Sequence, residues 1–122
     1  MPWTLDNDRP IYLQLMERLQ QDIASGFYKA GDKLPSVREL ALDAAVNPNT
    51  MQKSLSELER LGLVYAYRTS GRYITEDKNI LKKMKTDMAA EHIEDFFQKM
   101  NLLGFDKKET LELVKNMIQG DE

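Results

Sequence analysis

Cysteine is absent from this chain of 122 residues, and histidine occurs once. Without cysteine the chain can form no disulfide and can use no thiolate, which suits a cytoplasmic protein. Long apolar runs are missing as well, so no segment is expected to span a bilayer. The first residues lack the basic and apolar regions of a signal peptide. We therefore expect a cytoplasmic protein that makes no contact with a membrane.

Patterns typical of catalysis and cofactor binding are missing too. The sequence has no glycine-rich loop that could cradle a phosphate, and no serine in a nucleophile-elbow setting. His92 lies beside Glu91, Glu94 and Asp95, but one imidazole without a second ligand-bearing segment is weak support for a metal site. We expect no enzyme activity, no cofactor and no bound metal.

The net charge is −3, and the two parts of the chain share it unequally. Residues 1–75 carry nine basic and nine acidic side chains, whereas residues 76–122 carry eight and eleven. Within the neutral part, the segments 44–56 and 64–75 contain basic residues and no acid. Binding to phosphate depends on local potential more than on net charge, so these two segments remain candidates for contact with nucleic acid.

The segment around residues 34–51 predicts two short helices joined by a tight turn. Ser36 and Glu39 have the spacing of a capping box, in which each side chain bonds a free backbone N–H of the first turn. Asn47 offers a side-chain cap, and Pro48 suits the first helical position, where no N–H is needed. A helix from Ser36 to about Asp43 followed by a second helix is typical of a helix-turn-helix.

The second of these helices is expected to run from Asn47 to Leu61 and to stop at Gly62. Its inner face is predicted to consist of Met51, Leu55, Leu58 and Leu61. Its opposite face carries short polar or basic side chains, the kind that can reach base edges from the first turns of a recognition helix. The residues of that face are Asn49, Gln52, Lys53 and Ser56.

An earlier amphipathic helix precedes this pair. Asp8 is the expected cap, Pro10 lies in the first turn, and the helix stops at Gly26. Its buried stripe is predicted to consist of Tyr12, Leu15, Met16, Leu19 and Ile23. A connector rich in turn residues, among them Gly31 and Asp32, leads on to the helix-turn-helix.

A β-hairpin is expected directly after the recognition helix. Residues 63–68 and 72–75 are rich in β-forming side chains, and Thr69, Ser70 and Gly71 separate them as a turn. Arg68 and Arg72 flank this turn and could reach phosphates or a minor groove. A hairpin in this position is the wing of a winged helix-turn-helix.

Residues 76–122 read as two further helices, the second starting with a capping-box spacing at Asp106 and Glu109. A pair of helices this short cannot bury its apolar faces alone, so we expect a dimerisation tail that packs against a second copy. The residues assigned to that interface are Leu81, Met84, Met88, Phe96, Phe97, Met100, Leu111, Val114, Met117 and Ile118. The predicted fold is mainly α with a small β-hairpin, divided into a winged helix-turn-helix domain (1–75) and a helical tail (76–122).

With these residues identified, the chain resembles the GntR family of bacterial transcription regulators from about Arg9 to Thr75. The short tail resembles that of the YtrA-type small subfamily, whose members dimerise through it and are often repressors. The motifs that carry the likeness are Pro10-Ile11-Tyr12, the run from Gly31 to Ala41, Val46-Asn47-Pro48-Asn49-Thr50, the run from Leu58 to Leu63, and Arg68 with Gly71.

The resemblance implies DNA contacts at the positions that match the family motifs. Arg38 matches an arginine that contacts DNA, and several relatives carry arginine where this chain has Pro48 and Gln52, so base preferences cannot be carried over. Ala45 stands in the turn where glycine is frequent. The expected DNA-binding residues are Ser36, Arg38, Asn47, Pro48, Asn49, Thr50, Gln52, Lys53, Arg68, Ser70, Gly71 and Arg72.

The expected function is sequence-specific binding of double-stranded DNA by a homodimer that represses transcription at an inverted-repeat operator. Two other interpretations stay open. A winged helix can serve as an adaptor that binds another protein, and a DNA-binding repressor can be gated by a small-molecule effector of unknown identity. The polar, acid-free face of the recognition helix favours DNA over a protein partner.

Overall fold

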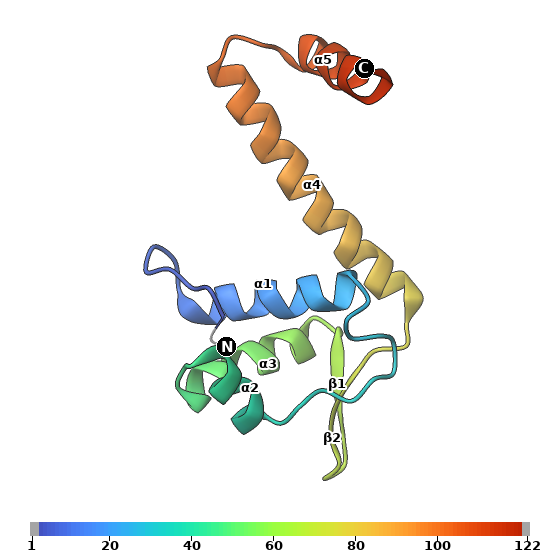
Figure 1. The fold of residues 1–122 in the computed structure, drawn as a ribbon. Coiled ribbons are helices and arrows are strands. Elements are labelled where there is room, and N and C mark those ends of the chain that lie inside the picture. The colour runs from blue at the N-terminus through green and yellow to red at the C-terminus, as the bar shows by residue number, and fades with distance from the viewer. Residues whose placement is uncertain (1–2, 121–122) are drawn as a thin grey trace. The chain divides into compact units, whose positions relative to one another are not determined.

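The computed structural model describes residues 3–120 and is mainly helical with one antiparallel hairpin, as the sequence predicts (Figure 1). Among these residues no helix is both long and apolar enough to cross a membrane. The elements in chain order are α1 (Ile11–Ala24), α2 (Val37–Ala44), α3 (Pro48–Arg60), β1 (Val64–Tyr67), β2 (Gly71–Ile74), α4 (Lys78–Leu102) and α5 (Lys107–Gln119).

The chain divides into two compact units, one ending at Met84 and the other starting at Lys85. This division falls inside α4, whereas the predicted boundary after Thr75 precedes that helix. Residues 1–2 and 121–122, the outer ends of the two predicted domains, lie outside the described part of the chain.

The core of the first unit lies where its three helices and the base of the hairpin meet. α3 packs against α1, α2 and β1. Each large apolar side chain taken out of water there contributes on the order of 1.5–3 kcal/mol to folding. The large side chains with less than 2% exposure in this core include Leu15, Leu19, Leu40, Met51, Leu55, Leu58 and Ile74.

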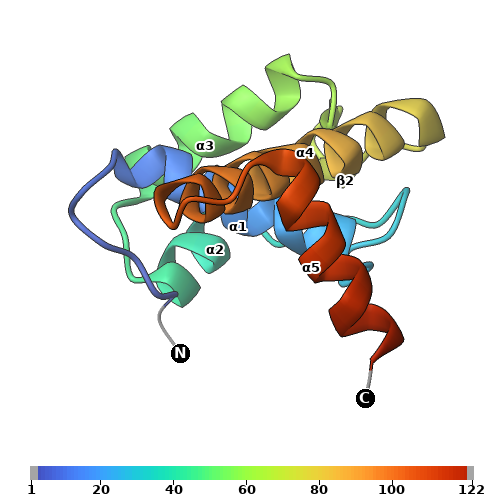
Figure 2. The same cartoon turned by 90° about the horizontal axis from the view of Figure 1, so that it is seen from above.

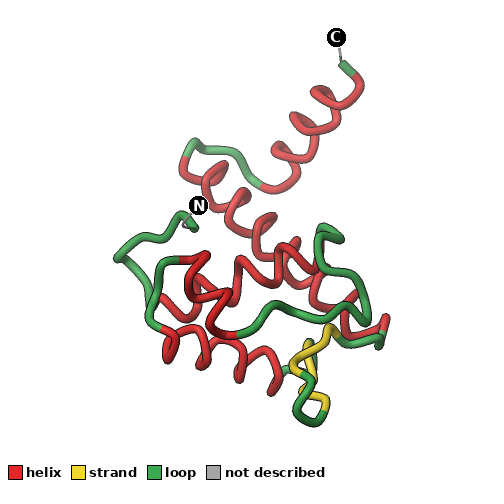
Figure 3. The backbone as a smooth tube through the Cα atoms, turned by 60° about the horizontal axis from the view of Figure 1, so that its bottom comes forward, coloured by secondary structure: helices red, strands yellow, loops and turns green. Residues whose placement is uncertain are grey.

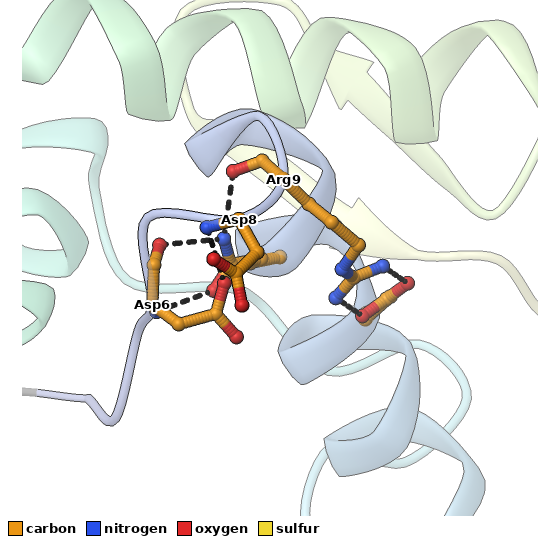
Figure 4. A network of polar contacts seen from close by, with 5 residues as sticks. Asp6, Asp8 and Arg9 are labelled. Atoms are coloured by element: carbon orange, nitrogen blue, oxygen red, sulfur yellow. Dashed lines mark hydrogen bonds and ion pairs between the residues drawn. The ribbon is translucent and has the colours of Figure 1, made fainter.

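The start of α1 differs from the prediction. Pro10 is the N-cap and has no side-chain cap, while the N–H of Asp8 donates to Oδ1 of Asp6 at 3.0 Å. The predicted cap at Asp8 is therefore wrong. The buried side chain of Gln14 instead holds the lead-in, because it accepts from the N–H of Asp6 and donates to the carbonyls of Asp6 and Arg9, each at 2.9 Å. Figure 4 shows Asp6, Asp8 and Arg9 gathered at this end of the helix.

Both helices of the helix-turn-helix start where predicted. α2 has Ser36 as N-cap with a complete capping box, and α3 has Asn47 as N-cap with Pro48 at its first position. The turn between them contains Ala45 in the left-handed region, with φ 60° and ψ 48°. α3 ends at Arg60, so Leu61 is the C-cap and 44% of it is exposed. The prediction that Leu61 faces the core is wrong.

The wing is a hairpin whose base is buried and whose tip projects from the helices of the first unit (Figure 3). Val64 pairs with Ile74 at the base, and Tyr67 pairs with Gly71 at the tip. The turn consists of residues 68–70, so Gly71 belongs to β2 and not to the turn as predicted. The connector adds to this sheet, because Lys33 forms an antiparallel bridge with Tyr73.

The second unit contains the later part of α4 and the whole of α5, joined by a short turn (Figure 2). α5 begins with the predicted capping box, in which Asp106 and Glu109 bond each other's backbone N–H groups at 2.8 and 3.0 Å. Gly104, with φ 95°, lies in the turn between α4 and α5. Thr110 is the only buried residue between 85 and 120.

Candidate nucleic-acid interface

The start of α2 presents a cation beside a capped helix end. Glu39 is occupied by the capping box, because its Oε1 accepts the N–H of Ser36 at 2.9 Å while its own N–H donates to Ser36 Oγ at 3.1 Å. The N–H of Ser36 lowers the pKa of the Glu39 carboxyl. Arg38 is exposed and has no ion-pair partner within residues 3–120. The guanidinium of Arg38 is therefore available to a ligand.

The outward face of α3 is polar and exposed along its first three turns. The Asn47 side chain accepts from the N–H of Asn49 at 2.7 Å, so its oxygen is used as a cap. Pro48, Asn49 and Gln52 are exposed, whereas Thr50 is half-buried. Gln52 Nε2 donates to Ser56 Oγ at 3.3 Å, and the Gln52 amide oxygen has no hydrogen-bond donor among the described residues. This face therefore offers both hydrogen-bond donors and hydrogen-bond acceptors to the bases in a DNA groove.

Lys53 is held more tightly than an exposed lysine usually is. Its Nζ lies 4.0 Å from the centre of the Tyr12 ring, at the start of α1. A cation over an aromatic face at this distance is attracted by the negative face of the ring. Lys53 therefore extends from α3 toward α1, and its charge marks the edge of the polar face.

The tip of the wing carries Arg68 in a left-handed conformation with φ 52°. Its guanidinium carbon lies 5.2 Å from the centre of the Tyr67 ring. The hydroxyl of Ser70 forms a short hydrogen bond with that of Tyr73, which ties the turn to β2. Arg68 and Ser70 therefore remain at the tip, as predicted, on a turn that is held by its own side chains.

Arg72 is placed differently from Arg68. Its side chain is only 19% exposed, and its Nε donates to Glu59 Oε1 of α3 at 2.9 Å. Along β2 the residues alternate between faces, so Arg72 faces α3 with Ile74 while Tyr73 faces away. Its guanidinium is already paired with a carboxylate, whereas that of Arg68 is not.

A groove of about 310 Å³ separates the start of α2 from the wing. It brings together three of the four predicted wing residues and Ser36. Gly71 has φ 135°, a backbone conformation that residues with a side chain rarely adopt, and a Cβ at this position would also lie 3.1 Å from Cε of the flexible Lys33 side chain. The residues that line the groove are Lys33, Leu34, Pro35, Ser36, Val37, Glu39, Ser70, Gly71 and Arg72.

Three residues of this region were not assigned to the site from the sequence. Tyr12 lies under Lys53, Glu59 binds Arg72, and Lys33 lines the groove against Gly71. Tyr12 and Lys33 both belong to motifs of the family resemblance, which was the available signal. Glu59 lies in such a motif as well, the run from Leu58 to Leu63, but nothing in the sequence indicated its pairing, because its partner lies on another element. Within residues 3–120 no group of three histidine or carboxylate side chains is arranged to hold a metal.

The residues predicted for dimerisation differ in exposure. Met84 is buried and belongs to the first unit. Those that are half-buried are Leu81, Met88, Phe97, Met100 and Val114, and those that are exposed are Phe96, Leu111, Met117 and Ile118. Leu102, 86% exposed, and Leu103, 71% exposed, extend the uncovered apolar surface of the tail.

The chain is similar to known proteins over nearly its whole length. It is 40% identical over 114 residues to the HTH-type transcriptional regulator YhcF of Bacillus subtilis, covering 93% of this chain and 94% of that protein. It is 37% identical over 109 residues to the HTH-type transcriptional repressor YtrA of Bacillus subtilis, covering 88% and 84%. A solved GntR family transcriptional regulator from Listeria monocytogenes matches with a TM-score of 0.83 at 40% identity, covering 91% and 97%.

The family model for bacterial regulatory proteins of the gntR family matches residues 11–74, from the first residue of α1 to the last of β2. The matched segment holds every element of the winged helix-turn-helix. The likeness to YhcF and YtrA continues beyond it through the tail. The chain therefore belongs to the gntR family of bacterial regulatory proteins, which are DNA-binding transcription regulators and not enzymes.

Proposed function

We propose that this regulator is a cytoplasmic homodimer that represses transcription by occupying an inverted-repeat operator. The observation that carries the proposal is the exposed, acid-free face at the start of α3, together with Arg38 of α2, which is exposed and forms no ion pair within residues 3–120. Double-stranded DNA presents phosphates to the cation and base edges to the amides, so this pairing of side chains fits its groove. The relative YtrA is a transcriptional repressor, which supports repression over activation.

Asn49 and Gln52 are the residues that would read bases. Each lies on the first turns of α3 and is exposed, and amide side chains can bond adenine through two atoms at once. Asn47, Pro48 and Thr50 shape this end of the helix. Lys53 would contact the edge of the DNA groove that α3 enters. A specific amide–base pair contributes about 1–3 kcal/mol of discrimination.

Arg38, Ser36 and Arg68 would bind phosphates and hold the protein in register. Arg38 and the start of α2 would approach the DNA backbone from one wall of the groove between α2 and the wing, and the wing with Arg68, Ser70 and Gly71 would approach it from the other. Such contacts raise affinity for any sequence and make it depend on salt.

The tail supports the homodimer. Several of the tail's apolar residues, including Met117 at 84% and Ile118 at 79% exposure, are left exposed by residues 3–120. A second copy offers the same faces, and a two-fold symmetric interface is the commonest way for identical chains to bury them. Two α3 helices related by that axis would read two half-sites about one helical turn apart.

Selection of bound duplexes from a random pool by the full-length protein tests the proposal. The expected product is an inverted repeat that is bound with a salt dependence typical of several phosphate contacts. Arg38→Ala should weaken binding to that duplex about tenfold or more and reduce the salt slope by about one. Arg60→Ala is the matched control, because it removes an arginine at the far end of α3 that is already paired with Glu57.

Gln52→Ala separates reading of bases from binding to the backbone. It should relax the preference at one or two base pairs of each half-site while leaving the salt slope unchanged. Recovery of no enriched sequence, or equal binding by wild type and Arg38→Ala, would contradict the proposal. Enrichment of single half-sites would contradict its dimeric part alone.

A further inference from the structure

We infer that the Glu59–Arg72 pair is a brace that fixes the wing against the recognition helix, and that Arg72 acts on DNA by positioning and not by contact. The inference rests on the proposed function for its DNA-binding half only. The part that concerns the brace between the wing and α3 applies to the protein without DNA and does not depend on that function.

The wing needs such a brace because it is a small element. Each of its strands has four residues, and an isolated two-stranded hairpin is only marginally stable in water. Its base is held by burial, since Val64 and Ile74 are 2% and 0% exposed. Toward the tip the next pair on the inner face is Ala66 and Arg72, and burial there is incomplete.

Arg72 is the point where three segments of the interface meet. Its side chain donates to Glu59 of α3 at 2.9 Å, and its backbone carbonyl accepts the N–H of Leu34 at 2.9 Å. Leu34 directly precedes Pro35 and Ser36, where α2 begins. Arg72 therefore connects three segments: the recognition helix, the wing and the segment that leads to Arg38.

The contact differs from an ordinary surface ion pair. Glu59 and Arg72 are thirteen residues apart on different elements, and the Arg72 side chain is 19% exposed. The Arg60–Glu57 pair of the same helix joins neighbouring turns, and its arginine is 66% exposed. Only the first of these pairs restrains one element relative to another.

The two possible roles of Arg72 predict opposite effects of Glu59→Gln on DNA binding. If Arg72 binds phosphate, Glu59→Gln removes the carboxylate that pairs with Arg72 and so frees its guanidinium for DNA. It also removes one negative charge from the DNA-binding domain, so binding to DNA tightens. If the pair is a brace, the same change loosens the wing and binding weakens. We expect affinity for the selected duplex to fall about fivefold, which is the upper end for an ion pair that is partly exposed.

Glu57→Gln is the matched control. It removes the same charge from the same helix and breaks the Arg60 pair, which does not touch the wing. Its affinity for DNA should stay equal to that of the wild type or rise slightly. Tighter binding by Glu59→Gln than by Glu57→Gln would overturn the inference and assign Arg72 to a phosphate.

Amide hydrogen exchange of the full-length protein without DNA tests the brace directly. The N–H of Leu34 reports on Arg72, because it donates to the Arg72 carbonyl, and should exchange about fivefold faster in Glu59→Gln. The N–H of Ile74 donates to the carbonyl of Asp32 at the buried base and serves as the internal reference, with unchanged exchange. The charge-swapped double variant, Glu59→Arg with Arg72→Glu, should restore slow exchange at Leu34 relative to Arg72→Glu alone.

Unchanged exchange at Leu34 in Glu59→Gln would overturn the inference whatever the result with DNA. Failure of the wild-type protein to bind any selected duplex would instead overturn the proposed function, and with it the DNA-binding half of the inference. A Leu34 amide that is faster in Glu59→Gln and slow in Glu57→Gln supports the brace in either case.

Discussion

The two units of the chain contain similar helices but bury very different side chains. In the described part of the chain, all buried apolar residues lie between Leu15 and Met84, within the first unit. In the second unit the one buried residue is Thr110, whose hydroxyl donates to the carbonyl of Asp106 at 2.7 Å. The first unit therefore has a core of its own, whereas the described helices of the second unit leave most of their apolar side chains exposed or half-buried.

The largest expected effect tests this contrast with one pair of leucines. Leu58→Ala removes a side chain with 0% exposure from the centre of α3 and should lower the free energy of unfolding by about 2–5 kcal/mol. Leu102→Ala, at 86% exposure, should change it by less than about 0.5 kcal/mol. Denaturant unfolding of both variants, at several protein concentrations, gives the comparison. Equal losses would show that the tail has a core as well.

The next largest effect tests whether a second copy of the chain covers the exposed apolar side chains of the tail. Ile118→Ser should leave the unfolding of the first unit unchanged and raise the dimer dissociation constant about thirtyfold, or about 2 kcal/mol, because a buried isoleucine is lost from the interface. Lys115→Ser, an exposed polar position of the same helix, is the control. Sedimentation equilibrium measures both. A wild-type chain that stays monomeric would contradict the assignment of these faces to a second copy.

The same contrast explains what could be predicted from the sequence. The starts of α2, α3 and α5 were predicted correctly because a cap is a contact between neighbours, as at Ser36 with Glu39 and at Asp106 with Glu109. The stripes of α1 and α3 were predicted correctly, except at Leu61, which is exposed, and at Tyr12, which is only half-buried, because burial follows helical spacing away from the helix ends. Asp8 failed as a cap because the Gln14 side chain, and not a cap, holds that turn.

The contacts that join separate elements could not be predicted. The hydroxyl of Ser54, with 0% exposure, donates to the carbonyl of Tyr12 at 2.8 Å across forty-two residues of sequence, and so fixes α3 on α1. Arg72 was assigned to DNA from its place beside a turn, whereas the strand register directs its side chain to Glu59. Such pairings depend on which face a strand presents, and a shift of one residue reverses it.

The units also differ in which residues adopt a positive φ. In the described part of the tail that residue is Gly104, whereas the first unit uses several glycines and, in addition, Ala45 and Arg68, both of which lie in segments assigned to DNA. A left-handed conformation costs an L-residue about 1–2 kcal/mol, of which glycine's extra freedom when unfolded offsets part. Ala45→Gly should therefore stabilise the first unit by about 0.5–1 kcal/mol, measured by thermal unfolding. Destabilisation would show that the Ala45 methyl group contributes packing that outweighs the strain.

The smallest expected effect is a loss of stability of the first unit as the pH is lowered. The Ser36 N–H lowers the pKa of Glu39 in the folded chain, so ionised Glu39 stabilises the start of α2 at neutral pH. This contribution is complete above the pKa of the unfolded chain and is lost as the pH falls through the lowered folded pKa. Glu39→Gln keeps an acceptor oxygen but not the charge, so its stability deficit relative to the wild type should shrink as the pH is lowered from about 7 to about 3. Chemical denaturation across that range measures the deficit, and a deficit that stays constant would mean that the charge of Glu39 contributes nothing to the cap.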